Sequence, residues 1–535
     1  MRRTLLMSVG VLLSFFGCHG TPSGDGEPAF DTACDGAPCS VFVSAPTLTL
    51  RDDPNTPLSA VLTVQTTVPT RLGWRLVSDR HASEHSPSDV ATTHSASVLD
   101  LRPGLTHTLT VSATDDSGQV HTWDGALQVV PPELPPDFPP LTTTTSLADR
   151  MAPGLTLVAL PTEVPGASNF LVVLDAAGEV AWLHRADEPI RAVTPLSDGR
   201  LALLLGRERI QFLYPSGEVD QTWAAGSGQW TGPADVAVDA FAFHHELIEL
   251  DQGHLAVLSA EVRSVPDYPL SEEANPPVLE QNVVGDVLLE LDPTGEVVGR
   301  WALQDQLDPT RVGRDAVLSE WWSGYLGGTQ RDWSHSNSVD WDPDSNDFLL
   351  SVRHQDALVR FNRDSGEPVW IVGPKANWTA PWIDSVLDPA TDLEVSPYHG
   401  HGANFGPDGT VVVFDNHNWG ASAGEPPLPV DSLVSRAVVL DVDPVAGTWR
   451  TAFAFSDLGA TPYYDFGGDA DLLKNGNLLF SPGHAWKGPA NLKTGGQVFE
   501  VDPADGSVVF HVEIPDGWTG VDRVQRIPSL YQWVP

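Results

Sequence analysis

Basic side chains are scarce in this chain. Its 535 residues include 29 Lys and Arg against 71 Asp and Glu, which gives a formal net charge of −42. This balance argues against a nucleic-acid partner, because phosphates need a basic surface. It also repels anionic membrane surfaces, so we expect any membrane link to be a lipid anchor or a protein partner. We interpret the acidity as a solvated surface that keeps the protein soluble.

Cysteine and long apolar runs are also rare. The three cysteines lie before residue 40, and the one long apolar run, Thr4–Phe16, is short for a bilayer crossing. Gly17 and Cys18 then resemble a bacterial lipoprotein processing site, although Phe15 stands where a smaller or branched residue is usual. We therefore predict a signal peptide over residues 1–18, lipidation of Cys18, and export to the periplasm or the cell surface of a bacterium.

The segment after the signal peptide has the composition of a tether. Residues 19–40 are rich in Gly, Pro, Asp and Ser, which is typical of a flexible linker. Cys34 and Cys39 lie within it. In an exported chain they either form a local disulfide or remain two unpaired thiols.

Residues 41–130 are predicted to form a small β-sandwich. Short alternating runs such as AVLTVQT and HTLTVSAT are separated by turn residues. The stretch from Leu101 to Gly118 resembles the end of a fibronectin type III module, with His107 where that family usually has tyrosine. Trp74 is the expected buried core aromatic of this domain.

A proline-rich linker over residues 131–148 is expected to separate this sandwich from a larger domain, because proline cannot donate to a sheet. Residues 149–535 are dominated by strand–turn–strand pairs such as LLELDPTGEVVGRW and VFEVDPADGSVVFHVEI. Residues 308–334 break the pattern, and we expect a short helix there.

One layout recurs through this larger domain. Seven residues separate an opening residue from a glycine, after which a hydrophobic strand follows. The opening residues are Arg191, His245, His401 and Gly468, and His335 opens a fifth copy with a longer turn. Repeats of about four strands predict a β-propeller. We count six blades, with the first near Gly154 and the segment VQRIPSLYQWV closing the ring; seven blades is the alternative count.

In a propeller, equivalent positions of successive blades surround one axis. His245, His335 and His401 open three consecutive blades, so side chains far apart in the sequence are expected to meet at one end of the ring. A single such histidine is usually a structural hydrogen-bond partner. Three of them, with Arg353 near the end of the strand after His335, favour a reactive site.

The motifs around these histidines resemble the bacterial arylsulfate sulfotransferase family over roughly residues 150–535. The resemblance rests on linked motifs in the right order: Asp332, Trp333, His335, Asn337, Ser338, Ser351, Arg353, His354, Gln355, Trp370, Ile371, Gly373, His244, His245, His401, Pro407, Asp408, Gly409, Phe414, Asp415, Asn416, Ser435 and Arg436. Gly400 and Gly402 depart from the family, which usually has glutamine and an acidic residue there.

The resemblance implies an all-β, six-bladed propeller that moves a sulfuryl group from a phenolic sulfate ester to another phenol, without a nucleotide donor or any other cofactor. It implies that His401 is sulfated transiently and that His245, His335, Asn337 and Arg353 line the pocket. His244 and His399 are neighbours that could exchange roles with His245 and His401; His244 is included among the substrate-binding residues.

The chemistry of these side chains fits the implied roles. A neutral imidazole is a nucleophile at pH 7, and a guanidinium binds the sulfuryl oxygens. A second histidine, His335 or His245, exchanges the phenolic proton, and Asn337 adds a neutral donor. Two half-reactions through a covalent intermediate predict ping-pong kinetics. The chemistry requires no metal, and the sequence leaves a structural cation and the oligomeric state, a homodimer included, open.

Parts of the sequence are open to other interpretations. Asp340, Asp342, Asp344 and Asn346 alternate like calcium ligands, but flanking hydrophobic strands favour a hairpin turn. A non-catalytic surface propeller that binds glycans or proteins is the main alternative function. A quinoprotein dehydrogenase would need a metal–cofactor constellation that the sequence does not supply, and a sulfatase would need a Cys/Ser-x-Pro-x-Arg motif, which is missing.

Overall fold

The computed structural model describes residues 40–86, 89–162, 168–226, 230–459, 463–484, 495–515 and 520–531. The predicted signal peptide, Cys18 and the pair Cys34 and Cys39 lie outside these ranges. Strands dominate the described chain. None of its helices is both long and apolar enough to cross a membrane.

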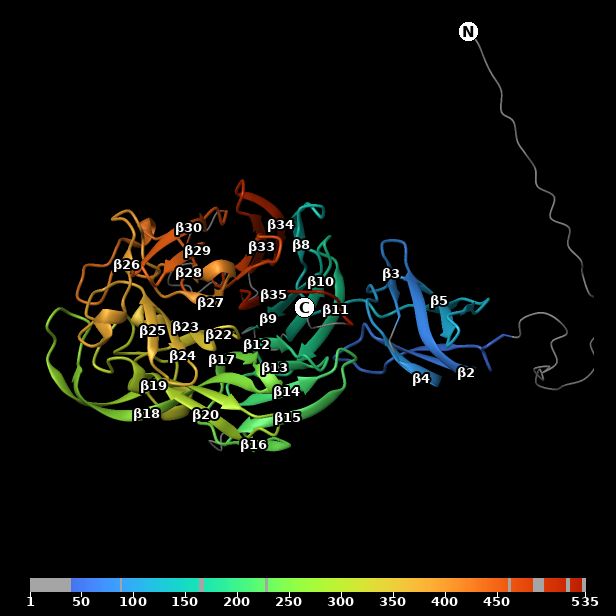
Figure 1. Cartoon of the computed structure of the whole chain (residues 1–535), viewed down its shortest axis with the longest axis horizontal. Coiled ribbons are helices and arrows are strands. Elements are labelled where there is room, and N and C mark those ends of the chain that lie inside the picture. The colour runs from blue at the N-terminus through green and yellow to red at the C-terminus, as the bar shows by residue number, and fades with distance from the viewer. Residues whose placement is uncertain are drawn as a thin grey trace, which may run out of the picture.

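Six sheets surround a common axis, as Figure 1 shows, and confirm the six-bladed propeller. From the axis outwards, the first three blades are β35 (Arg523–Ile527), β9 (Leu155–Leu160), β10 (Asn169–Leu174) and β11 (Val180–Ala186); β12 (Ile190–Pro195), β13 (Leu201–Leu205), β14 (Arg209–Leu213), β15 (Val219–Ala225) and β16 (Val236–Val238); and β17 (His244–Glu249), β18 (Leu255–Pro269), β19 (Val278–Leu291) and β20 (Val297–Ala302), with β21 (Arg331–Asp332) beside β19.

The other three blades follow the same order. They are β22 (Ser336–Asp342), β23 (Asp347–Val352), β24 (Ala357–Asn362) and β25 (Pro368–Val372); β27 (His401–Phe405), β28 (Thr410–Asp415), β29 (Arg436–Asp443), β30 (Thr448–Phe455) and β26 (Asp388–Pro389); and β31 (Asp469–Leu472), β32 (Leu478–Ser481), β33 (Gln497–Asp502), β34 (Ser507–Glu513) and β8 (Thr142–Ser146). Short helices connect some strands: α1 (Leu303–Gln306), α2 (Ser323–Leu326), η1 (Asp251–Gly253), η2 (Arg353–Gln355), η3 (Trp382–Ser385), η4 (Pro407–Gly409) and η5 (Val430–Ser432).

Two strands from opposite ends of the propeller sequence close the ring. β35, which follows every other strand in the chain, is the innermost strand of blade 1, as the sequence predicts. β8 pairs with β34 and becomes the outermost strand of blade 6. The predicted linker 131–148 therefore contains a propeller strand. The threonines of β8 favour a strand, but the prolines just before them favour a linker, so the sequence does not predict this strand.

The blades adhere to one another through apolar side chains on both sheet faces. One buried cluster lies at each of the six interfaces between neighbouring blades. The recurring glycine ends the turn before the second strand. Gly199, Gly253, Gly409 and Gly476 have φ between +75° and +89°, a region that residues with a β-carbon rarely adopt. The turn at residues 342–346 is the predicted hairpin, joining β22 to β23.

The N-terminal unit is a separate seven-stranded sheet, with its own apolar core, which includes Trp74 as expected. Its strands are β1 (Thr47–Leu50), β2 (Ala60–Val77), β3 (Ala82–His85), β4 (Val90–Val98), β5 (His107–Asp115), β6 (Val120–Thr122) and β7 (Leu127–Val129). The likeness to fibronectin type III stays a prediction.

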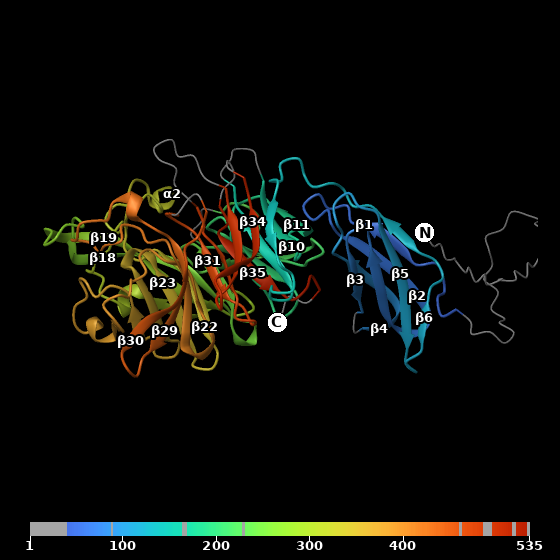
Figure 2. The same ribbon diagram turned by 90° about the horizontal axis from the view of Figure 1, so that it is seen from above.

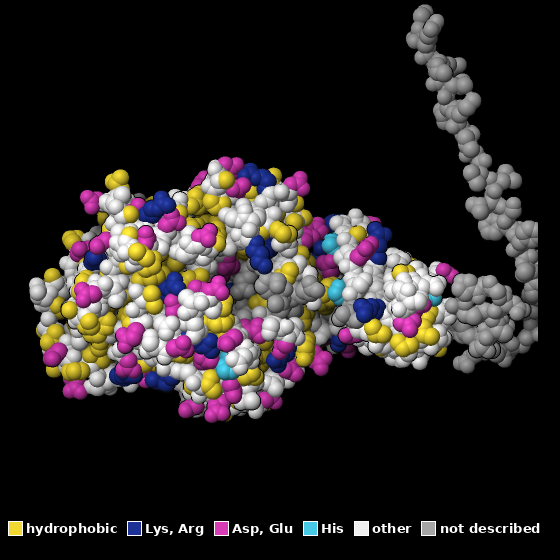
Figure 3. All heavy atoms as spheres, viewed as in Figure 1, with side chains coloured by type: hydrophobic (Ala, Val, Ile, Leu, Met, Phe, Trp, Pro, Cys, Tyr) yellow, Lys and Arg dark blue, Asp and Glu magenta, His cyan; other side chains and the backbone are white. Residues whose placement is uncertain are grey.

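This unit packs beside blade 1, as both ribbon views show (Figures 1 and 2). The buried Arg102 donates to Asp175 of the β10–β11 turn at 2.9 Å. Tyr531, which follows β35, stacks on His85 and donates to the carbonyl of Leu99. Acidic side chains are spread over both units on the face in Figure 3.

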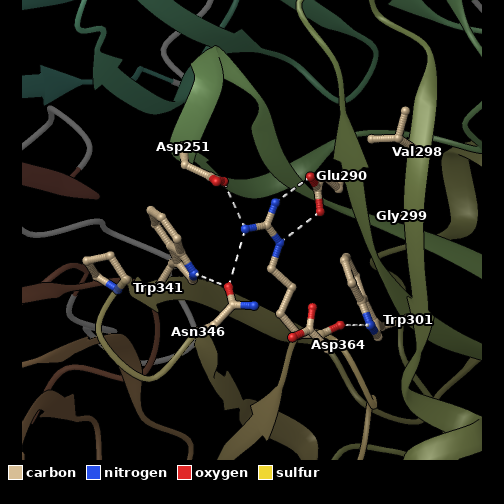
Figure 4. A pocket seen from close by; sticks show the side chains of 10 residues that line it. Asp251, Glu290, Val298, Gly299, Trp301, Trp341, Asn346 and Asp364 are labelled. Carbon is tan, nitrogen blue, oxygen red and sulfur yellow. Dashed lines mark hydrogen bonds and ion pairs between the residues drawn. The ribbon is translucent and has the colours of Figure 1, made fainter.

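A partly buried ion-pair network joins blades 3 and 4 on the wall of an open pocket of about 670 Å³ (Figure 4). Arg363, in the β24–β25 turn, donates to Asp251 at 2.9 Å and to Glu290 at 3.0 Å, and both carboxylates belong to blade 3. Hydrogen bonds from Arg363 come first among the causes that outweigh burial and lower the pKa of Glu290.

We expect Arg363→Ala to lower the free energy of unfolding by about 2–3 kcal/mol, because Glu290 would stay buried without its cation. Arg450→Ala is the matched control, because Arg450 pairs with Asp441 on an exposed part of blade 5 and should contribute at most ~1 kcal/mol. Calorimetric unfolding of both variants measures the difference. Equal shifts in the two would contradict the network's role.

Candidate active site

The opening residues lie where the inner strands lose their regular register. The pairing shifts between His244 and Leu247, between Ser336 and Ser338, and between His401 and Asn404. His245 and His335 adopt left-handed backbone with φ of +57° and +47°. Such irregularities re-aim side chains, and here they turn them towards one end of the ring.

The predicted histidines are brought together. The ring centres of His245 and His335 are 5.1 Å apart, and those of His335 and His354 are 4.4 Å apart. His401 joins them from blade 5, where the carbonyl of the preceding Gly400 accepts a hydrogen bond from Asn337 of blade 4 at 2.8 Å. We call His244, His245, His335, His354, His399 and His401 the histidine cluster.

The tautomer of His401 is fixed by its contacts. Its Nδ1 lies 2.6 Å from Asn416 Oδ1 and 3.2 Å from the carbonyl oxygen of His399, which are both acceptors. The Asn416 amide is itself oriented, because its NH₂ group donates to the carbonyls of Tyr464 and Gly467. The Gly467 N–H points at Nε2 from 3.3 Å. Nδ1 therefore carries the proton, and Nε2 presents a lone pair.

Hydrogen bonds also fix the tautomers of His335 and His245. His335 donates from Nδ1 to Asp332 at 2.5 Å. His244 donates from Nε2 to the carbonyl of Ser259, so its Nδ1 accepts a hydrogen bond from the Nδ1–H of His245, 2.9 Å away. In their neutral forms, His245, His335 and His401 thus all have an unprotonated Nε2.

Burial keeps these imidazoles neutral. It lowers the pKa of His245, His335 and His401 well below the ordinary value, and for the last two the charge of Arg353 is the next cause. Burial also lowers the pKa of His354 to about 3. His399 differs: burial and Arg353 lower its pKa, but Asp356 and Asp315 outweigh them and raise it.

Arg353 is a buried cation with little opposite charge in contact. Its side chain is 11% exposed, and its one ion pair among the described residues is with Asp315 at 4.0 Å. Asp315 is shared with His399 at 3.3 Å and Trp419 at 3.3 Å. Nε of Arg353 has no hydrogen-bond partner in the described structure. A guanidinium in this state is suited to an incoming oxyanion.

Asn337 and His244 are both buried, with 0% and 1% of their surface exposed. The Asn337 amide donates to the carbonyl of Gly400 at 2.8 Å, which Ser351 also contacts. Gly402 takes φ of +60°, and a β-carbon there would approach Asp469 to 2.5 Å, so this departure from the family motif fits the local packing.

Several residues that hold the site were given no role by sequence reasoning. Asp332 and Asn416 orient histidines, and both belong to motifs that had been matched without a role. Arg523 of β35 donates to the carbonyls of His245 and Asn337 at 2.8 Å. Trp321, from the segment before α2, stacks on His245 with ring centres 4.6 Å apart. The expected short helix in 308–334 is confirmed as α2, and hydrogen bonds tie Trp322 and Ser319 to Asp332.

Two curated relatives resemble part of the chain. Arylsulfate sulfotransferase AssT of Escherichia coli O6:H1 is 28% identical over 34% of this chain and 36% of its own length, and AssT of Lelliottia amnigena is 27% identical over 35% and 37%. The match therefore spans about a third of each relative. A solved protein of unknown function from Bacteroides caccae aligns with 69% of this chain and 98% of its own, at 12% identity and a TM-score of 0.38.

A family model covers more of the sequence than these relatives do. It is described as Arylsulfotransferase (ASST), and it matches residues 142–520, from β8 to just before β35. The matched range contains every residue of the histidine cluster as well as Arg353. The chain therefore belongs to the arylsulfotransferase family.

Proposed function

We propose that the protein is an aryl-sulfate sulfotransferase, which moves a sulfuryl group from a phenolic sulfate ester to a phenolic acceptor. One observation carries the proposal: a neutral histidine with an unprotonated Nε2, His401, whose Nε2 is contacted by the Gly467 N–H at 3.3 Å, shares a buried site with Arg353, a cation that lacks a close carboxylate. Family membership and the two sulfotransferase relatives support the same reaction.

In the first half-reaction, Nε2 of His401 attacks sulfur and the bond from sulfur to the phenolic oxygen breaks. Arg353 binds the sulfuryl oxygens, whose charge persists through the step. The proton stays on Nδ1 of His401, and its hydrogen bond to Asn416 Oδ1 disperses the positive charge that develops on the imidazole. The product is an N-sulfated histidine and a free phenol.

His335 is the proposed proton carrier. Its Nδ1 is held by Asp332, so Nε2 takes up a proton when the anionic ester arrives, because a nearby negative charge stabilises imidazolium. That proton goes to the departing phenolate. In the second half-reaction His335 removes the proton of the acceptor phenol, whose oxygen attacks sulfur and breaks the nitrogen–sulfur bond. His245 stands beside it as the neighbouring base.

The other proposals concern the rest of the chain. We propose that residues 41–130 are a fibronectin type III-like module and that the protein is exported and lipidated at Cys18. The composition of residues 1–18 supports export. Outside the cytoplasm a ready-made aryl ester would replace a nucleotide sulfate donor.

His401→Ala should lower phenol-dependent turnover of para-nitrophenyl sulfate by at least ~10³, because it removes the nucleophile. Wild-type protein mixed with donor alone should gain the mass of one SO₃ group on the peptide that contains His401. His121→Ala, in the N-terminal sheet, is the control. Turnover that survives His401→Ala would disprove the assignment.

Arg353→Gln should reduce kcat/KM for the donor by roughly 10²–10³, the usual loss when one charge-stabilising donor is removed. Arg353→Lys should recover part of the lost kcat/KM, because lysine restores the positive charge but not the two parallel donors of the guanidinium group. Steady-state kinetics with Arg450→Gln as a surface control measure both effects. A loss no greater than that of the control would exclude Arg353 from sulfuryl binding.

The pH profile tests the tautomer of His401. Because the pKa of His401 is lowered, wild-type kcat/KM for para-nitrophenyl sulfate should not fall as pH drops from about 8 to about 6. Asn416→Asp places a carboxylate on Nδ1–H and raises the pKa of His401. As the pH is lowered, the variant should therefore lose activity at a higher pH than the wild type does. Asn475→Asp, on an exposed turn, should match the wild type. Overlapping profiles for Asn416→Asp and wild type would refute the role of Asn416.

A further inference from the structure

Two more arginines approach the histidine cluster, and the proposed mechanism does not use them. Arg191 is the opening residue of blade 2, and Arg207 lies in the turn between β13 and β14 of the same blade. In a ring of six, blade 2 stands across the axis from blade 5, which carries His401. The two arginines therefore flank the site on the side away from the proposed nucleophile.

Arg207 is held against the cluster by Trp321. Its guanidinium carbon lies 3.7 Å from the centre of the Trp321 ring, and it donates to the Trp321 carbonyl. Trp321 in turn stacks on His245. Among the described residues Arg207 has no ion pair. Asp332, whose charge acts on it, is already engaged by His335 and Trp322.

Arg191 is also poorly neutralised. Its guanidinium lies 6.0 Å from the centre of the Trp321 ring, and its one carboxylate neighbour in the described structure is Asp522 at 3.9 Å. Asp522 is bonded more closely to His484, at 2.7 Å. Nε of Arg191 is buried and has no hydrogen-bond partner in the described part of the chain.

The two cations repel each other. Burial and then the charge of Arg191 lower the pKa of Arg207 to about 10. In a chain with 71 acidic residues, an unneutralised arginine pair beside a reactive site is costly unless an anion completes it. The sulfuryl group is assigned to Arg353, so this anion is a second one.

We infer that Arg191 and Arg207 form a second anion subsite, which binds a carboxylate carried by the phenol. The inference rests on the proposed function and names its substrate class: hydroxyaryl carboxylates and their sulfate esters. The phenolic oxygen lies towards His401 and Arg353, the ring crosses the axis, and the carboxylate meets the guanidinium forks, which match its geometry.

The test compares two acceptors of nearly equal size, para-hydroxyphenylacetate and its neutral amide, with para-nitrophenyl sulfate as donor. We expect wild-type kcat/KM to favour the carboxylate by about tenfold to hundredfold, the range for hydrogen bonds to a charged group. Arg191→Gln should bring the ratio close to one, and Arg191→Lys should restore part of it.

Two further variants sharpen the result. Arg207→Gln should also lower the ratio of kcat/KM for the carboxylate to kcat/KM for the amide. Circular dichroism of this variant checks that the packing of Trp321 is unchanged. Arg200→Gln is the control, because Arg200 belongs to the same blade but is bonded to Asp198 and Asp220 on the surface. Its ratio should equal that of the wild type. A wild-type ratio near one, or a ratio unchanged in both Arg191→Gln and Arg207→Gln, overturns the subsite while sulfuryl transfer stands.

An equal loss with both acceptors in Arg191→Gln also overturns the inference, because it assigns the arginine to the sulfuryl group. If the wild type transfers no sulfuryl group to any phenol, the proposed function fails and calorimetry decides the subsite. Binding of para-hydroxyphenylacetate to the wild type that is lost in Arg191→Gln supports it. Absent or unchanged binding rejects it.

Discussion

The structure depends on apolar packing between blades. Each sheet is apolar on both faces and cannot bury both alone, so six sheets must pack face to face around an axis and the ring must close. Closure uses β35 on the inside of blade 1 and β8 on the outside of blade 6. Because the ring closes, equivalent positions converge, and residues as distant as His245 and His401 share one site.

In the resulting site, the positive charges of the arginines are only partly neutralised by carboxylates. Burial removes the charge from three histidines, while arginines beside them keep theirs with few carboxylates in contact. The surrounding protein is strongly acidic, yet its nearby carboxylates are engaged elsewhere, Asp332 by His335 and Asp522 by His484. Neutral nucleophiles beside weakly paired cations suit an anionic ester, because the ligand supplies the negative charge that neutralises the arginines.

Much of the fold could be predicted from the sequence, because a fixed count to a glycine marks four of the blades and His335 opens a fifth with a longer turn. The convergence of His245, His335 and His401 followed from that count. The supports of the site could not be predicted in the same way. Arg523 contacts backbone carbonyls of two other blades, and Trp321 comes from an irregular insertion, so neither contact leaves a local pattern. Arg191 occupies an opening position, but its approach to Trp321 depends on the same insertion.

Through Arg523, the closing strand β35 also supports the candidate site. The Arg523 guanidinium holds the backbone of His245 and of Asn337, so the strand that seals the ring also sets the floor of the site. β35 follows every other strand along the chain, and blades 1 to 6 can therefore exist in part before the site does. The backbone positions of His245 and Asn337 are therefore fixed only once the closing strand is in place.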